Sequence, residues 1–275
     1  MKQLYVYDIE VYKDCVLFGF IDPKTHKMRI FELSARRNNA TSLRRFLTTR
    51  VKGLIGFNNL SYDNAIINYF LRTKIINPLK YYELSQKIIN MNLKTPKLIP
   101  QLDVYKVNHW DNKARRTSLK AAEARMNFHN VADLPYAFDA KLKFYQIDKL
   151  SAYLRNDLEA TLKVYDLFQD KYYLRSVMKR EYDLTATNWS DSKIGEELLL
   201  KLLCERTGQD PDDVRKMRTH REKIKISDII FDYVKFETLQ LKELLKTIRK
   251  EVIVDTKGGF KHVFEYGGIE THLAQ

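Results

Sequence analysis

The chain has 275 residues, 44 % of them hydrophobic, which is enough apolar material for one large folded domain or for a domain with a substantial appendage. Lys and Arg outnumber Asp and Glu by 48 to 35, and the resulting formal charge of +13 favours a polyanionic partner such as nucleic acid. With 9 Gly, 6 Pro and no apolar run of about 18 residues, the composition argues against a disordered, collagen-like or membrane-spanning chain.

The two cysteines, Cys15 and Cys204, are far apart and belong to no Cys/His cluster, so the sequence predicts neither a zinc finger nor a disulfide scaffold. Any metal is therefore expected to have oxygen ligands. Residues 1–12 contain acids inside their apolar stretch and no small-residue cleavage site, unlike a signal peptide. We expect a cytoplasmic protein in a reducing compartment, with no membrane partner.

The predicted elements begin with strands and continue as alternating strands and helices. In chain order they are strands over residues 3–12, 15–21 and 27–33, a helix over 41–50, a strand over 53–57, a helix starting near Ser61 and a strand over 99–107. Helices alone follow, over residues 117–126, 147–173, 177–187 and 192–206. This order predicts an α/β sandwich around a mixed sheet.

The pattern changes after Thr207, where a charged Pro/Gly segment precedes a strongly basic stretch. We therefore predict a domain over residues 1–207 and a basic connector over residues 208–275. The connector is expected to hold a helix over 237–250 and a β-like tail that contains Gly258–Gly259 and Gly267–Gly268.

Two carboxylates share one face of the first predicted strand. Asp8 and Glu10 are two residues apart, so in an extended strand their side chains point the same way, about 7 Å apart. Such a pair is unfavourable unless a cation neutralises it or the strand forms a solvated sheet edge. The strand by itself leaves both interpretations open.

Asp63 follows an apolar strand, an amide pair and an aromatic residue, and it opens a helix. This places it where strand ends and helix starts converge, the usual location of an α/β active site. The helix dipole also favours an acid in the first helical turn, which is a purely structural explanation.

Tyr153 and Asp157 are four residues apart in a predicted helix and therefore lie on one helical face. A tyrosine hydrogen-bonding within a solvated helix would give the same spacing.

The three segments together resemble the Exo I, Exo II and Exo III motifs of the DEDDy 3′→5′ exonucleases. The matching residues are Asp8-Ile9-Glu10, Asn59-x-x-Tyr62-Asp63 and Tyr153-x-x-x-Asp157. The pattern is most similar to the proofreading domain of phage-type family B DNA polymerases. This resemblance implies an α/β, RNase H-like (DnaQ-like) exonuclease fold with a mixed central sheet and a helical C-terminal extension.

The resemblance also implies hydrolysis of 3′-terminal phosphodiesters with two Mg²⁺ or Mn²⁺ ions, giving 5′-monophosphates. Asp8, Glu10 and Asp157 would surround one ion, with Asp8 shared, and Asp63 would serve the second ion through water. Tyr153 would position the attacking water and would not act as a base, since the pKa of a phenol is about 10.

Three residues near the second motif are expected to contact DNA. Asn59 would donate a hydrogen bond to the terminal nucleotide, and Phe57 or Tyr62 would stack on a frayed 3′ base.

Three further DNA contacts are expected in the following part of the chain. Ser118 and Leu119 lie in a segment similar to the (S/T)Lx₂h motif that contacts single-stranded DNA, although a helix N-cap followed by a core leucine explains them equally well. Lys143 is the candidate for a lysine near the scissile phosphate, and Lys141 is its alternative.

The resemblance continues past the third motif. The segment Asn188–Gly195 is similar to one found there in phage family B polymerases, and Tyr266-Gly267-Gly268-Ile269 resembles the linker to the polymerase domain. Since the two-aspartate polymerase site is not expected in this chain, we expect the proofreading part of a split or truncated polymerase from a phage-infected bacterial cell. Its expected partners are single-stranded DNA or a frayed primer 3′ end, and a separate polymerase subunit.

Other interpretations remain. The chain can be a stand-alone single-strand DNA exonuclease, an excised fragment, or a catalytically silent DNA-binding protein of the same fold. All four acids and the tyrosine are present, which argues against the silent protein. An RNA-degrading DEDD enzyme is disfavoured because neither His129 nor His220 takes the place of the tyrosine.

Overall fold

The structure is a computed structural model that describes residues 2–91, 93, 95–112, 116–217, 223–250, 252–254, 261–266 and 269–274. For residues 223, 224 and those from 252 onward, the structure describes the course of the backbone alone. The chain divides into two compact units, Met1–Leu199 and Leu200–Gln275, and each is described by itself. The division falls inside a helix, earlier than the predicted boundary between residues 207 and 208.

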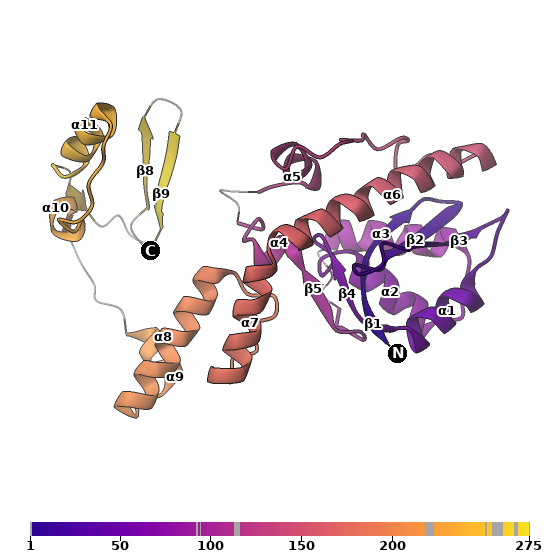
Figure 1. Cartoon of the computed structure of the whole chain (residues 1–275), viewed down its shortest axis with the longest axis horizontal. Helices are drawn as coiled ribbons and strands as arrows, with labels where there is room; N and C mark the ends of the chain where they lie inside the picture. The colour runs from indigo at the N-terminus through magenta and orange to yellow at the C-terminus, as the bar shows by residue number, and fades with distance from the viewer. Residues whose placement is uncertain are drawn as a thin grey trace. The chain divides into compact units, whose positions relative to one another are not determined.

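A five-stranded mixed sheet forms the centre of the first unit (Figure 1). Its strands lie in the order β3-β2-β1-β4-β5. Their bounds are β1 Gln3–Val11, β2 Cys15–Ile21, β3 Met28–Ser34, β4 Val51–Gly56 and β5 Gln101–Asp103. β2 pairs antiparallel with both β1 and β3, whereas β1, β4 and β5 run parallel. The predicted α/β class with a mixed sheet is therefore confirmed.

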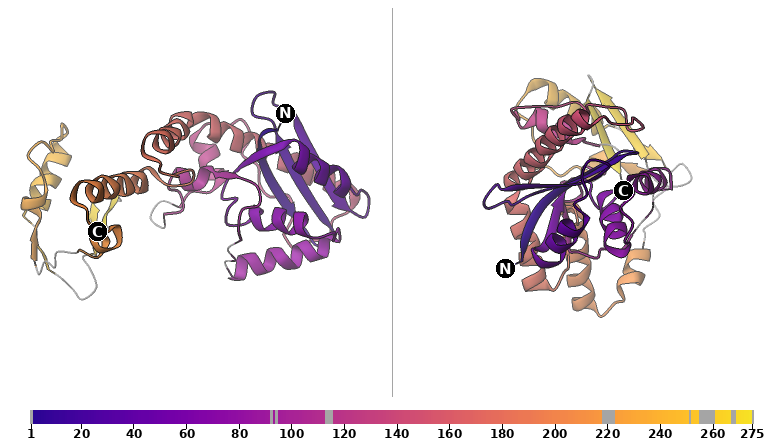
Figure 2. Two further views of the ribbon diagram at one scale, coloured as in Figure 1. Left: turned by 90° about the horizontal axis from the view of Figure 1, so that it is seen from below. Right: turned by 90° about the vertical axis from the view of Figure 1, so that its right-hand side faces the viewer.

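Helices cover both faces of this sheet. The right-hand view of Figure 2 shows the sheet between α6 on one side and the helices α1 to α3 on the other. The bounds are α1 Ala40–Thr49, α2 Asp63–Arg72, α3 Pro78–Met91, α5 Leu119–Arg125 and α6 Phe144–Leu167. Apolar residues on each face of the sheet pack against the helices on that side, which gives two separate core clusters.

Strand β1 divides its side chains between the two clusters by simple alternation. Tyr5, Tyr7 and Ile9 pack toward α1, α2 and α3. Val6 packs toward α6. The residues in step with Val6 therefore point to the α6 face, and this sets the direction of the acids that follow it.

The other elements are the helices that follow β5 and α6 in the chain and the smaller elements of the second unit. The helices that follow β5 and α6 are α4 Val104–Val107, α7 Gln169–Tyr182 and α8 Asp191–Thr207. The later elements are α9 Pro211–Lys216, β6 Lys223–Lys225, α10 Ile226–Ile229, α11 Leu239–Ile248, β7 Val252–Val254, β8 Lys261–Tyr266 and β9 Ile269–Ala274. β6 pairs with β7 and β8 with β9, both antiparallel. The predicted Gly258–Gly259 and Gly267–Gly268 lie outside the described residues.

The structure corrects several predicted bounds. The strand predicted over 99–107 ends at Asp103, because the Asp103 carboxylate accepts the backbone N–H of Tyr105 at 3.1 Å and caps α4. The long helix predicted over 147–173 is two helices that meet at Phe168. The helix predicted over 177–187 ends at Tyr182, since Asp183 adopts a left-handed conformation with φ 51°.

A side chain continues the sheet beyond β5. Asn188 accepts the backbone N–H of Asp103 at 2.7 Å and donates to the carbonyl of Gln101 at 2.9 Å. These are the backbone groups that a further strand would bind. The segment that carries Asn188 is thereby fastened to the edge of the sheet.

Among the residues that the structure describes, no helix combines the length and hydropathy required to cross a bilayer.

Candidate metal centre

The α6 face of the sheet brings three acids together. Asp8 and Glu10 lie on β1 in step with Val6, and Asp157 lies on α6 opposite them. One carboxylate oxygen from each of the three lies within 4.8 Å of the other two. Their separation along the sequence shows that the cluster depends on how closely α6 approaches the sheet.

That close approach depends on Gly19 of β2. Gly19 pairs directly with Asp8, so the two residues share the α6 face. A Cβ atom at Gly19 would lie 2.7 Å from Leu158 Cδ1 and 2.9 Å from Leu154 Cγ. Because glycine has no side chain, α6 can pack closely against β2 beside Asp8.

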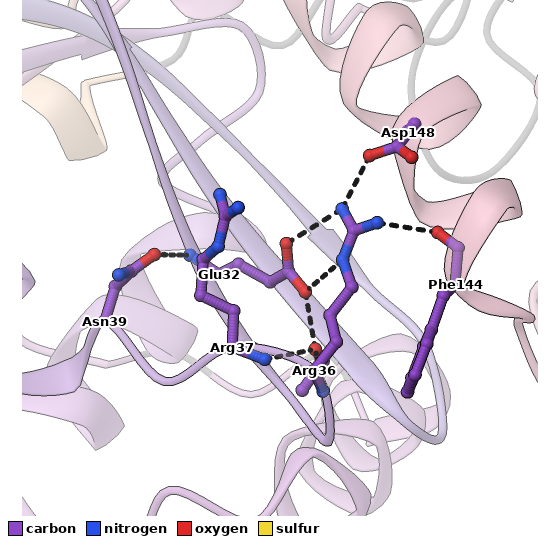
Figure 3. A network of polar contacts seen from close by, with 7 residues as sticks. Glu32, Arg36, Arg37, Asn39, Phe144 and Asp148 are labelled. Carbon is purple, nitrogen blue, oxygen red and sulfur yellow. Dashed lines mark hydrogen bonds and ion pairs between the residues drawn. The ribbon is translucent and has the colours of Figure 1, made fainter.

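A network of hydrogen bonds and ion pairs around Arg36 fixes the beginning of α6 (Figure 3). The Arg36 guanidinium donates from Nε to Glu32 at 2.9 Å and from Nη2 to Asp148 of α6 at 2.8 Å. It also donates from Nη1 to the carbonyl of Phe144 at 2.7 Å. Glu32 is 3 % exposed, so it anchors this arginine from within the sheet layer. The network therefore ties the first turn of α6 to β3.

Asp63 lies beside the three-acid cluster but is not a member of it. It opens α2, is 5 % exposed, and its Oδ1 atom has no hydrogen-bond partner within the described structure. The negative charge of Asp8 acts on it directly. A buried carboxylate oxygen without a donor is unfavourable, and a cation would relieve it.

The side chain of Asp103 holds the loop before Asp63 in place. Its carboxylate accepts the backbone N–H of Asn58 at 2.9 Å and of Leu60 at 3.3 Å. Asn58 has a positive φ of 56°, a conformation that asparagine tolerates better than most residues. The amide pair Asn58-Asn59 thus lies in a tight turn that sets the start of α2.

Burial raises the pKa of all four acids, and repulsion by neighbouring carboxylates raises it further in three of them, Glu10, Asp63 and Asp157. Burial raises the pKa of Asp8 to about 6, and burial together with the charge of Asp8 raises that of Asp157 to about 8. The pKa values of Glu10 and Asp63 are raised well above their usual range for the same two reasons. The cluster therefore holds protons at a pH where isolated carboxylates are charged, and a bound cation would replace them.

Tyr153 is a neutral hydrogen-bond donor to the cluster. Its hydroxyl donates a hydrogen bond to Asp157, one helical turn away, as the spacing of these residues requires. Burial and the charge of Asp157 raise the pKa of Tyr153, so the phenol stays protonated at neutral pH.

An open groove of about 980 Å³ runs past this site. Glu10 and Tyr153 form part of its wall, and Asn58, Tyr62 and Arg116 line it as well. Apolar and aromatic side chains line much of the groove, among them Tyr82, Ile88, Ile89, Leu134 and Phe138, and Asp139 is a second acid in its lining. The groove combines carboxylates, one arginine and an apolar surface suited to flat rings.

The predicted DNA contacts near the second motif lie in different places. Tyr62 lines the groove and shares a hydrogen bond of 2.7 Å with Ser85. Asn59 is fully buried, and its amide N–H donates to Gln101 at 2.7 Å. Phe57 packs against Tyr105 and Trp110 in the α6-side core and is not among the residues that line the groove.

The contacts predicted later in the chain are at helix starts. Ser118 is the N-cap of α5 and accepts the backbone N–H of Ala121 at 3.1 Å, and Leu119 packs on the α6-side core. Lys143 is the exposed N-cap residue of α6, and Lys141 is exposed two residues earlier. None of these four lines the groove.

Sequence reasoning missed Asn58 and Arg116 as groove residues. For Asn58, the signal was the Asn-Asn pair at a strand end, where the first residue is the one placed to take a positive φ. For Arg116, a basic residue just before a helix cap carries no specific signal. His220, which the sequence analysis weighed against the tyrosine, lies outside the described residues.

The geometry establishes that Asp8, Glu10 and Asp157 can hold a metal ion through oxygen ligands, with Asp63 adjacent. Comparison of the chain with protein-family models, curated proteins and solved structures finds no match.

Proposed function

We propose that the chain is a metal-dependent 3′→5′ DNA exonuclease of RNase H-like fold. The observation that carries this proposal is the meeting of Asp8, Glu10 and Asp157 within 4.8 Å, beside a protonated Tyr153 in a groove wall. The strand order β3-β2-β1-β4-β5 with β2 antiparallel is compatible with that fold. The formal charge of +13 supports a nucleic-acid substrate.

The chemistry of the four acids fits Mg²⁺ or Mn²⁺, and their surroundings favour a bound cation. They offer hard oxygen donors, they lie in an environment that raises their pKa values, and the buried Asp63 Oδ1 lacks a donor. Asp8, Glu10 and Asp157 would hold one ion, and Asp63 with Asp8 would hold a second. When bound, the ions would supply an activated water and would stabilise the leaving 3′ oxygen.

The remaining side chains bind and orient the substrate in this proposal. Tyr153, as a neutral hydroxyl, orients the attacking water by a hydrogen bond. Arg116 neutralises a phosphate at the groove wall. Tyr62, Tyr82 and Phe138 offer ring surfaces for the terminal bases, and stacking of this kind is independent of base identity.

We further propose that the biological role is proofreading with a separately encoded polymerase. This part rests on the resemblance of the three motifs and of the segment Asn188–Gly195. The chain alone is then expected to add no nucleotides to a primer. Robust primer extension by this chain would exclude the role.

Polarity and cofactor dependence test the activity itself. A single-stranded oligodeoxynucleotide with a 5′ label should shorten stepwise in Mg²⁺, and the same strand with a 3′ label should release the label as a mononucleotide first. A chelator should stop both reactions. An unpaired 3′ end should react faster than a matched duplex end, which must first unpair at a cost of a few kcal/mol.

A matched RNA strand and a circular DNA strand serve as controls. Cleavage of the circle would indicate an endonuclease, and faster loss of RNA would indicate a ribonuclease. Shortening of the strand from its 5′ end would contradict the proposal directly.

A further inference from the structure

A second groove lies on the face of the sheet opposite the metal centre. It has a volume of about 850 Å³ and is formed by the start of β1, the β2–β3 turn, β3 and α1. Its floor contains Tyr5 and Phe46 of the core cluster on the α1 side, whereas Asp8 and Glu10 point toward α6. The two grooves are therefore separated by the sheet itself.

Four cationic side chains line this second groove. They are Lys27, Arg29, Arg45 and Arg50, and all four are exposed. Within the described part of the chain, none of them forms an ion pair or donates a side-chain hydrogen bond. Other cations of the same unit are paired, such as Arg36 with Glu32 and Lys171 with Asp191. The positive charge of the groove is therefore uncompensated.

The single acid of the groove does not neutralise these cations. The Asp22 carboxylate accepts the backbone N–H of Lys24 at 2.9 Å and the Gln3 side-chain amide at 2.5 Å. It is 7 % exposed and serves the turn between β2 and β3. The surrounding sequence is also depleted of acids, because residues 23–50 contain eight Lys or Arg and one acid, Glu32.

The lining of the groove suits a phosphate chain better than bases or a lipid surface. Tyr5 and Phe46 are each 6 % exposed, so their faces are not free for bases to stack on, and the Arg29 guanidinium lies 5.9 Å from the Phe46 ring centre. None of the large hydrophobic side chains that are exposed on the described surface lines the groove. A membrane-binding surface would normally combine its cations with such side chains.

The cations and hydroxyls of α1 extend along the groove. Ser42, Arg45 and Thr49 are spaced by three and four residues and therefore form one stripe on the helix. At 1.5 Å per residue the stripe is about 10 Å long, which exceeds the size of a single phosphate. Lys27 and Arg29 form the opposite wall, from the turn and β3.

We propose that this second groove binds the phosphate backbone of a nucleic-acid strand, without regard to base sequence and separately from the metal centre. The site extends the contact between protein and nucleic acid to the far face of the sheet. The binding is independent of the proposed hydrolysis, because none of its residues belongs to the acid cluster. A strand held there would keep the polymer near the enzyme between successive cleavage events.

The sharpest test compares two neighbouring substitutions in the first turn of α1. Ser42→Glu places a carboxylate inside the groove, whereas Thr41→Glu places the same charge beside it, since Thr41 is exposed but does not line the groove. Both positions favour an acid equally with respect to the helix dipole. Fluorescence anisotropy of a labelled single-stranded oligodeoxynucleotide would be measured in chelator, in an Asp8→Asn, Asp157→Asn background that excludes cleavage.

We expect Ser42→Glu to weaken binding at least about tenfold and Thr41→Glu less than about threefold. The triple substitution Lys27→Gln, Arg45→Gln, Arg50→Gln should also lower the slope of log affinity against log salt by about 2, at about 0.7 per lost phosphate contact. The matched triple Lys24→Gln, Arg37→Gln, Lys74→Gln removes the same charge from exposed positions outside both grooves and should change the slope much less.

The groove would be excluded as the binding site if Ser42→Glu and Thr41→Glu weakened oligonucleotide binding equally, or if the two triples had equal salt slopes. Only a general effect of charge would then remain. Vesicles of anionic phospholipid and inorganic phosphate at the same ionic strength distinguish the source of the phosphate. The proposal would also be overturned if Ser42→Glu weakened the binding of vesicles or of inorganic phosphate but left oligonucleotide binding unchanged. Circular dichroism and thermal unfolding verify that each variant is folded. If the groove triple is not folded, Arg45→Gln alone is measured in its place, with Arg37→Gln alone as its control.

Discussion

The two faces of the central sheet carry clusters of ionisable groups of opposite kind, acids on one face and cations on the other, in different environments. On the α6 face, Asp8, Glu10 and Asp157 crowd together in a buried or half-buried position, and their pKa values are raised. On the α1 face, the four cations of the second groove are exposed to solvent. Buried like charges lower stability until a specific ion arrives, whereas exposed ones do so very little. The acid cluster is therefore expected to bind a specific ion in an all-or-none way. The second groove is expected to bind its ligand with an affinity that changes gradually with salt concentration.

The largest effect is expected from removing a carboxylate on the α6 face. Asp157→Ala should reduce nuclease activity at least about 10³-fold, because it removes an oxygen ligand of the proposed metal ion. It should also abolish the rise in Tm that Mg²⁺ or Mn²⁺ produces. Glu159→Ala, two residues along α6 and outside the cluster, is the control and should retain activity. If both variants lose activity equally, the acids act through the fold and not as ligands.

Tyr153→Phe should have the next largest effect, a loss of about 10- to 10³-fold in turnover. The hydroxyl orients water in the proposed mechanism, but its removal takes away no metal ligand. Metal affinity, measured by the shift in Tm with metal concentration, should therefore change little. A variant that loses metal affinity as much as Asp157→Ala does would show that Tyr153 mainly holds Asp157 in place.

Gly19→Ala tests whether the close approach of α6 makes the cluster. The added methyl group would collide with Leu154 and Leu158, which should move α6 and destabilise the protein by about 1–3 kcal/mol. We expect activity per folded molecule to fall about 10- to 100-fold as the Asp8–Asp157 spacing changes. Gly195→Ala is the control, since a Cβ there meets nothing within 4 Å in helix α8 and should be neutral or stabilising. Full metal affinity in Gly19→Ala would refute this role.

The smallest effect is expected in the pH dependence of stability. The folded protein holds the protons of Asp8 and Asp157 more tightly than the unfolded chain does, since their pKa values are about 6 and about 8. The contribution of the pair to the free energy of unfolding should therefore fall as the pH rises from about 4 to 8. Thermal unfolding in chelator should show this fall, and an Asp8→Asn, Asp157→Asn variant should lack it. The metal-induced rise in Tm should be larger at about pH 8 than at about pH 5. A rise independent of pH would mean that these protons are not displaced by metal.

The sequence predicted the strands of the sheet because their apolar residues lie in short, well-separated runs. The spacing of Asp8 with Glu10, and of Tyr153 with Asp157, was local information, and each pair does share one face. Helix α3 was not predicted, although its buried residues Tyr81, Ser85 and Ile88 recur at helical spacing. The strand expected beyond Asp103 was wrong because a single capping carboxylate starts a helix there.

Contacts between distant segments could not be predicted from local patterns. The role of Gly19 depends on α6, which follows it by more than a hundred residues. Arg36 meets Asp148 across a similar separation. Asn59 matched a motif position, but its side chain is buried with Gln101, which no spacing rule indicates.

The amide of Asn188 has a consequence for self-association. An uncovered sheet edge invites pairing with the edge of another molecule, and proteins protect such edges in several ways. Here Asn188 occupies the outward N–H of Asp103 and carbonyl of Gln101, which are the groups that an incoming strand would need. The segment after α7 thus protects the outer edge of β5 from pairing with another strand. Loss of that amide would leave a short unpaired strand edge next to the turn that positions Asp63, so aggregation and distortion of the candidate metal centre would begin at the same place.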